Sequence, residues 1–290
     1  VAARPDMYIM ASRGCPFQCI YCNKSIWGMR ARFRKPELMI EEIKWLHGKY
    51  GVREIFFQDD TFNLNREWAE NIFNLIIDNG LNKDIVYKTQ FRANKQLVDR
   101  ELLELAKRAG FWLIFYGVES GNQQILNRMK KGLTIEELKR AFKLTHSVGL
   151  KTIASFIIGL PGETKETIKD TYNLWKELKP YKAGYYFATP FPDTELERIL
   201  IKKGHLLDND YDHYRFGPCF IRTDELSKED LEYYRAMIVS KMDLIDFIRK
   251  LRHLITNRQY LKRKIIDILK NPQILIDRIK FIIKGVKRSI

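Results

Sequence analysis

The stretch SRGCPFQCIYCN, residues 12–23, holds three of the four cysteines of the chain, Cys15, Cys19 and Cys22. It directly follows a short apolar run at residues 8–11, which predicts a strand. Three thiolates within eight residues match three corners of a cubane iron–sulfur cluster, and they leave the fourth iron without a protein ligand. An iron with an open position can bind something else there. We therefore predict a cluster that serves catalysis rather than a structural or a simple electron-transfer role.

Two other uses of these cysteines are weighed against the cluster. A closed zinc site needs four ligands, and the next candidates along the chain, His47 and Cys219, are distant from the loop in sequence. A disulfide would leave one thiol over, and four cysteines in 290 residues are few for a secreted scaffold. The spacing therefore favours the open-iron cluster, and we expect a buried apolar role for Cys219.

The composition allows one full catalytic domain with a smaller appendage. Of the 290 residues 45% are hydrophobic, yet there is no run of 18 apolar residues and no visible secretory signal. Free thiols and an oxygen-sensitive cluster both suit a reducing compartment, so we expect a cytoplasmic location. Because the chain opens at Val1 without an initiator methionine, we expect it to be a fragment of a longer protein.

Downstream of the cysteines, helical and strand patterns alternate. Helices are predicted at 37–50, 66–77, 102–109, 134–149, 165–178 and 194–203, and strands at 55–57, 85–91, 112–118, 151–158 and 184–188. With the run at 8–11 these elements give six βα units. Such an order predicts an α/β fold in which helices cover the outside of a parallel sheet.

The cysteine loop resembles that of the radical S-adenosylmethionine (SAM) superfamily, because Cys15, Cys19, Tyr21 and Cys22 match the pattern Cys-x-x-x-Cys-x-aromatic-Cys. The resemblance implies a [4Fe–4S] cluster whose free iron chelates the amino and carboxylate groups of SAM. It also implies reductive cleavage of SAM to methionine and a 5′-deoxyadenosyl radical, and it places Tyr21 beside the adenine. The superfamily's partial (βα)6 TIM-like barrel matches the six predicted units, so we expect this barrel with a C-terminal helical extension.

Residues that follow the predicted strands are candidates for the cofactor site, because barrel chemistry lies at the C-terminal strand ends. Asp59 and Asp60 follow the second strand, where adjacent acids are costly unless they bind a cation or hydrogen-bond donors. By position they correspond to the superfamily segment that contacts the methionine amino group, although that segment is usually glycine-rich; capping of the next turn is the alternative role. Arg92 follows the third strand, as a partner for a carboxylate or as a surface salt-bridge residue.

The fourth strand ends in GVESG at residues 117–121, and a glutamate at the end of a buried strand is rarely without function. The resemblance implies that Glu119 lines the cofactor site. The fifth strand leads into GLPGET at 159–164, which by itself makes a good loop and helix cap. By resemblance this segment lies against the adenine, with Gly159 allowing a close approach. The residues that it contributes to the cofactor site are Ser155, Ile157 and Gly159.

Within the superfamily, the motifs resemble most the branch that carries a cobalamin-binding domain before the barrel. That branch includes methylases of unactivated carbons and enzymes that form rings or rearrange skeletons. We therefore expect one of these reactions, a cobalamin-binding domain upstream of Val1, a small-molecule or lipid-like substrate and a reductant such as flavodoxin or ferredoxin. The alternatives are a methylthiotransferase-like enzyme that modifies tRNA and a non-catalytic iron–sulfur or RNA-binding protein.

The positive charge is concentrated near the C-terminus. Residues 249–290 hold 13 lysines and arginines against 2 acids, so they carry +11 of the net +15, and their apolar residues recur at helical spacing. We therefore divide the chain into a radical SAM barrel at 1–205, a linker at 206–224 and a basic amphipathic helical tail at 225–290. The apolar face of such a tail packs on the barrel, or the tail contacts the anionic inner face of a membrane. Binding to nucleic acid is a third alternative and is less favoured.

Overall fold

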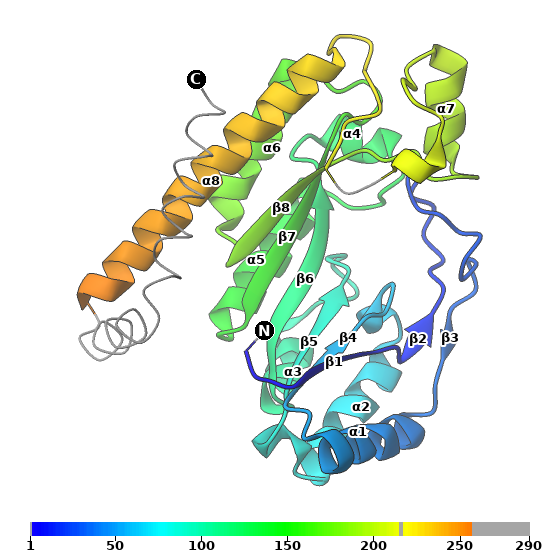
Figure 1. Cartoon of the computed structure of the whole chain (residues 1–290). Helices are drawn as coiled ribbons and strands as arrows, with labels where there is room; N and C mark the ends of the chain where they lie inside the picture. Colours follow the sequence, from blue (N-terminus) through cyan, green and yellow to red (C-terminus); the bar gives the residue numbers. More distant parts are fainter. Residues whose placement is uncertain (1, 215–216, 257–290) are drawn as a thin grey trace. The chain divides into compact units, whose positions relative to one another are not determined.

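A computed structural model of the chain describes residues 2–214 and 217–256. The chain consists of two compact units, Val1–Ala236 and Met237–Ile290, each held together mainly by contacts within itself. The first unit contains a six-stranded parallel sheet (Figure 1). Its strands are hydrogen-bonded in the order β1 (Asp6–Ile9), β4 (Glu54–Phe57), β5 (Val86–Phe91), β6 (Phe111–Glu119), β7 (Lys151–Ile158) and β8 (Lys182–Phe187).

A helix follows each strand before the next one begins. These helices are α1 (Pro36–Tyr50), α2 (Arg66–Asp78), α3 (Arg100–Arg108), α5 (Ile135–Ser147), α6 (Lys165–Leu178) and α7 (Glu195–Lys203). From α1 to α3 and on through α5 and α6, each of these helices contacts the next one in the series. Six βα units in a parallel sheet confirm the predicted α/β partial barrel.

Local sequence explains where these elements begin and which face they bury. Pro36 occupies the first turn of α1, and Thr134 forms a capping box with Glu137 at the start of α5. Along β7, side chains are buried at every second position, whereas Ser155 and Ile157 on the opposite face line cavities at the mouth of the barrel. The sheet therefore turns one face to the helices and the other to the barrel interior.

Some elements differ from the prediction. The first strand is Asp6–Ile9 rather than 8–11. The antiparallel pair β2 (Ser12–Arg13) and β3 (Arg32–Phe33) and the short helix α4 (Gln123–Arg128) were not predicted. Strands of two residues are too short to produce a periodic pattern, which is why the sequence does not reveal β2 and β3.

Residues 206–224, expected to be a linker, contribute to the first unit. Leu206 pairs with Ile221 in an antiparallel bridge, and Cys219 and Ile221 are buried. The Cys219 thiol donates to the Ile221 carbonyl at 3.3 Å, in keeping with the expected buried role. Helix α8 (Lys228–Thr256) follows, and residues 257–290, most of the expected basic tail, lie outside the described residues. No helix in the described ranges is long and apolar enough to cross a membrane.

Candidate active site

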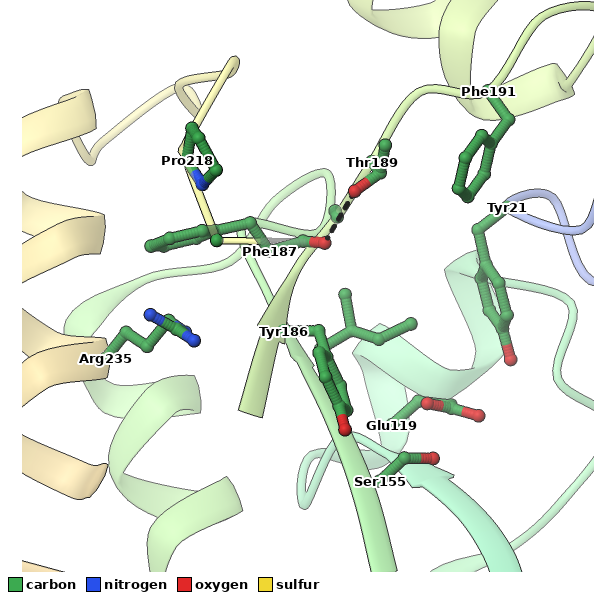
Figure 2. Close-up of a pocket in the computed structure, with 12 residues that line it drawn as sticks. Tyr21, Glu119, Ser155, Tyr186, Phe187, Thr189, Phe191, Pro218 and Arg235 are labelled. Atoms are coloured by element: carbon green, nitrogen blue, oxygen red, sulfur yellow. Dashed lines mark hydrogen bonds between the residues drawn. The ribbon is translucent and has the colours of Figure 1, made fainter. Parts of the chain in front are cut away.

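Two cavities adjoin at the C-terminal ends of the strands, and Tyr21, Glu119 and Ser155 line both of them. We call the first, of about 450 Å³, the cysteine cavity. Its lining includes Cys15, Cys19, Cys22, Gln58, Asp60, Gln90, Arg92 and Lys131. The second, of about 250 Å³, is the aromatic cavity, which is lined in addition by Ile157, Tyr186, Phe187, Thr189, Phe191 and Arg235. Figure 2 shows Tyr21 and Phe191 on one side of the aromatic cavity and Phe187 and Arg235 on the other.

The cysteine loop leaves β2 and returns through β3, and its backbone is held from several sides. Gly14 has φ +88°, and a Cβ at this position would lie 2.3 Å from the Arg30 carbonyl oxygen, so only glycine fits. The Ile20 amide donates to the Met129 carbonyl at 3.1 Å, which ties the loop to the segment after α4. All four cysteines of the chain are free thiols, so the disulfide alternative is wrong.

The stretch after β4 acts as a clamp on this loop. Asp59 is fully buried, and its Oδ1 accepts hydrogen bonds from the Ala11 amide at 2.8 Å and from the Ser12 amide and hydroxyl. Asp60 Oδ2 accepts from the Gly14 amide at 2.8 Å. Asp60 therefore both lines the cysteine cavity and holds the loop, whereas Asp59 does not line either cavity. The structure thus gives Asp59 a role in positioning the loop in place of the expected cofactor contact.

The same clamp continues to the end of β5. Asn63 accepts from the Arg92 amide at 2.9 Å and donates to the Arg92 carbonyl at 3.0 Å. Thr61 Oγ1 lies 3.7 Å from the Cys15 sulfur. Residues 59–63 therefore fix the cysteine loop and Arg92 relative to each other. Sequence reasoning identified the two acids as cofactor ligands, but it did not identify this shared positioning function.

Two positive side chains lie near Cys19 and favour its thiolate form. A hydrogen bond from Cys22, together with Lys131 and Arg92, lowers the pKa of Cys19 to about 4 against the cost of burial. Cys22, as the donor in that bond, has its pKa raised. Among the described residues, no three His, Cys, Asp or Glu side chains converge on one metal ion. A cubane differs from a single ion because each thiolate binds a separate iron.

Arg92 lies between the cysteine loop and the loop after α4. Its guanidinium stacks on the Phe17 ring at 3.5 Å from the centroid, donates to Asn94 at 2.6 Å and lies 3.9 Å from the Cys19 sulfur. Its second terminal nitrogen is buried without a hydrogen-bond partner. A buried unpaired donor on a cation is costly, and an anionic ligand would satisfy it. The surface salt-bridge alternative for Arg92 does not hold, because the side chain is only 8% exposed.

Glu119 enters the cavity through an irregular strand end. The register between β6 and β7 shifts between Gly117 and Glu119, and Glu119 has φ +67°, which is strained for a side chain of this kind. Its carboxylate pairs with the Lys131 ammonium at 2.8 Å, and both residues are buried. Lys131 also donates to the Tyr21 hydroxyl at 3.1 Å. Sequence reasoning missed Lys131, since a lysine in a short loop carries no signal of burial.

Of the candidate residues in β7 and directly after it, two line the cavities and one does not. Ser155 lines both cavities and Ile157 lines the aromatic cavity. Gly159 lines neither of them. It has φ +89°, and a Cβ at this position would lie 2.6 Å from Ile221 Cδ1, so the absence of a side chain makes room for Ile221. The Gly159 amide donates to an oxygen of the buried Glu163 carboxyl group. The close approach that requires a glycine here is therefore made by the chain itself, and the expected contact of Gly159 with adenine is not supported by its position.

Comparison with known proteins identifies the family. A model described as the radical SAM superfamily matches residues 9–174, more than half of the chain. The chain belongs to the radical SAM superfamily. This finding confirms the resemblance seen in the cysteine loop, and with it the assignment as an enzyme and the two cofactors of the superfamily, a [4Fe–4S] cluster and SAM.

Several relatives of this radical SAM chain carry names that describe their reactions. It is 36% identical over 211 residues to the uncharacterized methyltransferase PH0819 of Pyrococcus horikoshii, covering 72% of the chain and 45% of that protein. It is 30% identical over 220 residues to the anaerobic magnesium-protoporphyrin IX monomethyl ester cyclase of Cereibacter sphaeroides, covering 76% of the chain and 36% of that protein. The chain thus spans less than half the length of these two relatives.

A solved structure shows the same fold. The radical SAM methyltransferase TsrM of Kitasatospora setae, solved with cobalamin and a [4Fe–4S] cluster bound, aligns with a TM-score of 0.62 at 22% identity. The alignment covers 68% of the chain and 36% of TsrM. At this identity the comparison supports the barrel fold alone.

The residues of the radical SAM chain fit the cofactors of the superfamily. Cys15, Cys19 and Cys22 line one cavity and supply three sulfur donors, which suits a cubane with one open iron and does not complete a zinc site. Arg92, with its unpaired nitrogen, and the Glu119–Lys131 ion pair line this same cavity. The cavity therefore contains both positively and negatively charged side chains. An amino-acid zwitterion such as the methionine end of SAM needs both signs of charge in its binding site.

Proposed function

We propose that the protein containing this chain is a radical SAM enzyme that methylates or cyclises an unactivated carbon and binds cobalamin through another domain. Support comes from the names of the relatives, a methyltransferase and a cyclase, and from the cobalamin bound in TsrM. A putative methylthiotransferase of Methanocaldococcus jannaschii is also 30% identical to the chain over 206 residues. Names of methyltransferases and cyclases recur among more of the relatives, so the methylthiotransferase alternative is not proposed. The non-catalytic alternative is set aside, because the family is one of enzymes.

The observation that carries this proposal is the single cavity where three thiols, Arg92 and the Glu119–Lys131 pair meet. When bound, the cluster and SAM supply one-electron cleavage of the sulfonium and a radical that abstracts hydrogen. The three cysteines hold the cluster as thiolates. Arg92 donates to the methionine carboxylate, and Asp60 or Glu119 accepts from the ammonium group.

The aromatic cavity suits the nucleoside. Tyr21 and Ile157 offer flat and apolar surface for the adenine, while Ser155 and Glu119, at the junction with the cysteine cavity, accept from ribose hydroxyls. In the rest of the cysteine cavity, Phe56 and Phe115 stack with centroids 5.0 Å apart beside Gln58 and Gln90. These uncharged side chains are proposed to orient the reacting part of a small-molecule or lipid-like substrate.

Two partners complete the proposal. Each cleavage consumes one electron, so a reductant such as flavodoxin or ferredoxin is required. The excess of basic residues in 249–290 is proposed to bring the protein to an anionic membrane surface, as a peripheral contact that needs no spanning helix.

Labelled SAM distinguishes the two proposed reactions. Full-length protein, dithionite and a metabolite extract are incubated with SAM that carries a ¹³C-methyl group. Methylation predicts a product that contains the label, whereas ring formation predicts 5′-deoxyadenosine with no label in the product. If neither 5′-deoxyadenosine nor a labelled product forms in any extract, the proposed function is wrong.

A further inference from the structure

One charged side chain of the aromatic cavity has no role in the proposed function. Arg235 lines this cavity and belongs to the first unit, and Figure 2 shows it on the side opposite Tyr21 and Phe191. The other charged residue of the lining, Glu119, is already paired with Lys131 at 2.8 Å. The wall of the aromatic cavity therefore carries one positive charge that its own lining does not neutralise.

The first turns of helix α8 hold Arg235 in place. At the start of the helix, the Ser227 hydroxyl accepts from the Asp230 amide and the Asp230 carboxylate accepts from the Ser227 amide, both at 3.1 Å. Leu231 is fully buried, and its Cδ1 would lie 3.2 Å from a Cβ on Gly159, so this turn packs tightly against the loop after β7. Arg235 follows Leu231 by four residues and therefore lies on the same face of α8.

The fold uses only part of the Arg235 guanidinium. Its Nε donates to the Tyr185 carbonyl at 2.8 Å, on β8, the last strand of the sheet. The guanidinium also lies 5.1 Å from the centroid of the Phe187 ring. Within residues 2–214 and 217–256, no acceptor contacts its two terminal nitrogens and no acid forms an ion pair with it. Four of its five N–H donors are therefore available to a ligand.

The surroundings of Arg235 favour an anionic ligand. Phe187, Ala188 and Phe191 make much of the cavity wall apolar, and Arg235 itself is half-buried. A charge pair is stronger where apolar walls reduce the local dielectric constant. A guanidinium also offers parallel donors that match the oxygens of a carboxylate or a phosphate. An apolar cavity with one such group is typical of a site for an amphiphilic ligand.

SAM does not supply the anion that Arg235 suits. The carboxylate of its methionine end is proposed to bind Arg92 in the cysteine cavity, and its adenine is uncharged. Its sulfonium is a cation, which a further positive charge repels. The substrate is the molecule of the proposed reaction that can bring an anionic group to this side of the aromatic cavity.

We propose that Arg235 is a specificity-determining residue that anchors a carboxylate or phosphate group of the substrate in the aromatic cavity. The substrate is accordingly an amphiphilic anion. Its apolar part lies along Phe187 and Phe191 and leads past the nucleoside toward the cysteine cavity, where the reacting part is held. This inference rests on the proposed function and deepens it, because it names the substrate class of the same site.

The test measures the binding of model anions without turnover. Full-length protein with its cluster and SAM bound is titrated by calorimetry with octyl phosphate, octanoate and octanol, which share an apolar chain and differ in the head group. Arg235→Gln removes the charge, and Arg235→Lys keeps the charge but loses the parallel donors. Arg108→Gln makes the same charge change as Arg235→Gln at an exposed residue of α3 and is the control.

The wild type should bind one of the two anions at least about tenfold more tightly than octanol, because a charged hydrogen bond is gained. Arg235→Gln should weaken the binding of that anion by at least about tenfold, and Arg235→Lys by at least about threefold. Arg108→Gln should stay within about threefold of the wild type, and so should the affinity of every variant for octanol. The anion with the larger loss in Arg235→Gln identifies the head group as a carboxylate or a phosphate.

A wild type that binds neither anion more tightly than octanol would overturn the proposal, as would equal anion affinities in Arg235→Gln and Arg108→Gln. A fall in SAM affinity of more than about threefold in Arg235→Gln would place Arg235 at the nucleoside and would also overturn it. If Arg235→Gln does not keep its cluster, Arg235→Lys replaces it, and an unchanged anion affinity then counts against the proposal. A protein that binds the anion through Arg235 but forms no 5′-deoxyadenosine would keep this subsite and reject the proposed function.

Discussion

At the scale of single residues, the site depends on a buried ion pair next to the thiols. Glu119 is held in a left-handed conformation and is paired with Lys131, which also contacts Tyr21. A non-glycine residue in this conformation costs about 1–3 kcal/mol, and such strain persists where the surroundings hold the residue in place. The carboxylate is therefore positioned before any ligand binds.

Replacing Glu119 by alanine should weaken SAM binding by about 1–3 kcal/mol, because a charged hydrogen bond to the cofactor is lost. Iron content should stay unchanged, since Glu119 is not a cluster ligand. Equilibrium binding of SAM to the reconstituted chain measures the effect. Glu136→Ala, which removes an exposed carboxylate on α5, is the control. Equal affinities in the two variants would show that Glu119 only supports the fold.

At the scale of secondary-structure elements, the turn after β4 holds the cysteine loop in place. Asp59→Ala removes the acceptor of the Ala11 and Ser12 amides, and buried amides without acceptors cost about 1–3 kcal/mol each. We expect a loss of about 2–4 kcal/mol in the free energy of unfolding and reduced iron retention. The SAM affinity of the chains that keep their iron should be unchanged. Urea unfolding and iron analysis measure these effects.

Asp59→Asn is the matched control for the clamp, because its amide oxygen still accepts the backbone hydrogen bonds. It should lose less stability than Asp59→Ala. A variant that keeps its iron and its stability but no longer binds SAM would return Asp59 to the cofactor-binding role expected from the sequence.

The turn between β7 and α6 contains a buried carboxyl that responds to pH. Burial raises the pKa of Glu163 from 4.5 to about 8, against the hydrogen bonds from the Gly159 and Leu160 amides. The folded chain then holds a proton that the unfolded chain releases above pH 4.5, so stability falls as pH rises from about 4.5 to about 8.

Glu163→Gln should remove this dependence. The variant should match the wild type near pH 5 and be more stable by roughly 1–4 kcal/mol at pH 8. Denaturant unfolding at the two pH values measures the difference. A variant that is less stable than the wild type at pH 8 would show that the carboxylate form is the one that the fold needs.

The same elements show what the sequence could predict. The βα order was predictable because apolar periodicity marks each helix and strand from 36 to 203. Lys131 was not predictable, because only the folded chain brings it to Glu119 and Tyr21. Asp59 and Asp60 were treated as a pair, but both follow the end of β4, and only the folded chain shows that Asp59 accepts from Ala11 and Ser12 while Asp60 accepts from Gly14 and lines the cavity.

At the scale of the whole molecule, the charge distribution predicts a response to salt. Because 249–290 carry +11, full-length protein should sediment with vesicles that contain anionic lipid, and the bound fraction should fall as salt rises. Deleting residues 250–290 should abolish sedimentation and leave the cluster intact. Retention by tRNA instead of vesicles would favour an RNA target. Unfolding of the barrel on deletion would mean that the tail is a packing element.

The central claim is that Cys15, Cys19 and Cys22 hold a cluster with an open iron at the site where SAM is cleaved. The most direct measurement is the iron content and the 5′-deoxyadenosine yield of the anaerobically reconstituted chain, beside its Cys19→Ala variant. The wild type should hold about four irons and form 5′-deoxyadenosine from SAM with dithionite, and the variant should do neither. A stoichiometric cluster in Cys19→Ala, or a wild-type cluster that never yields 5′-deoxyadenosine, would contradict the claim.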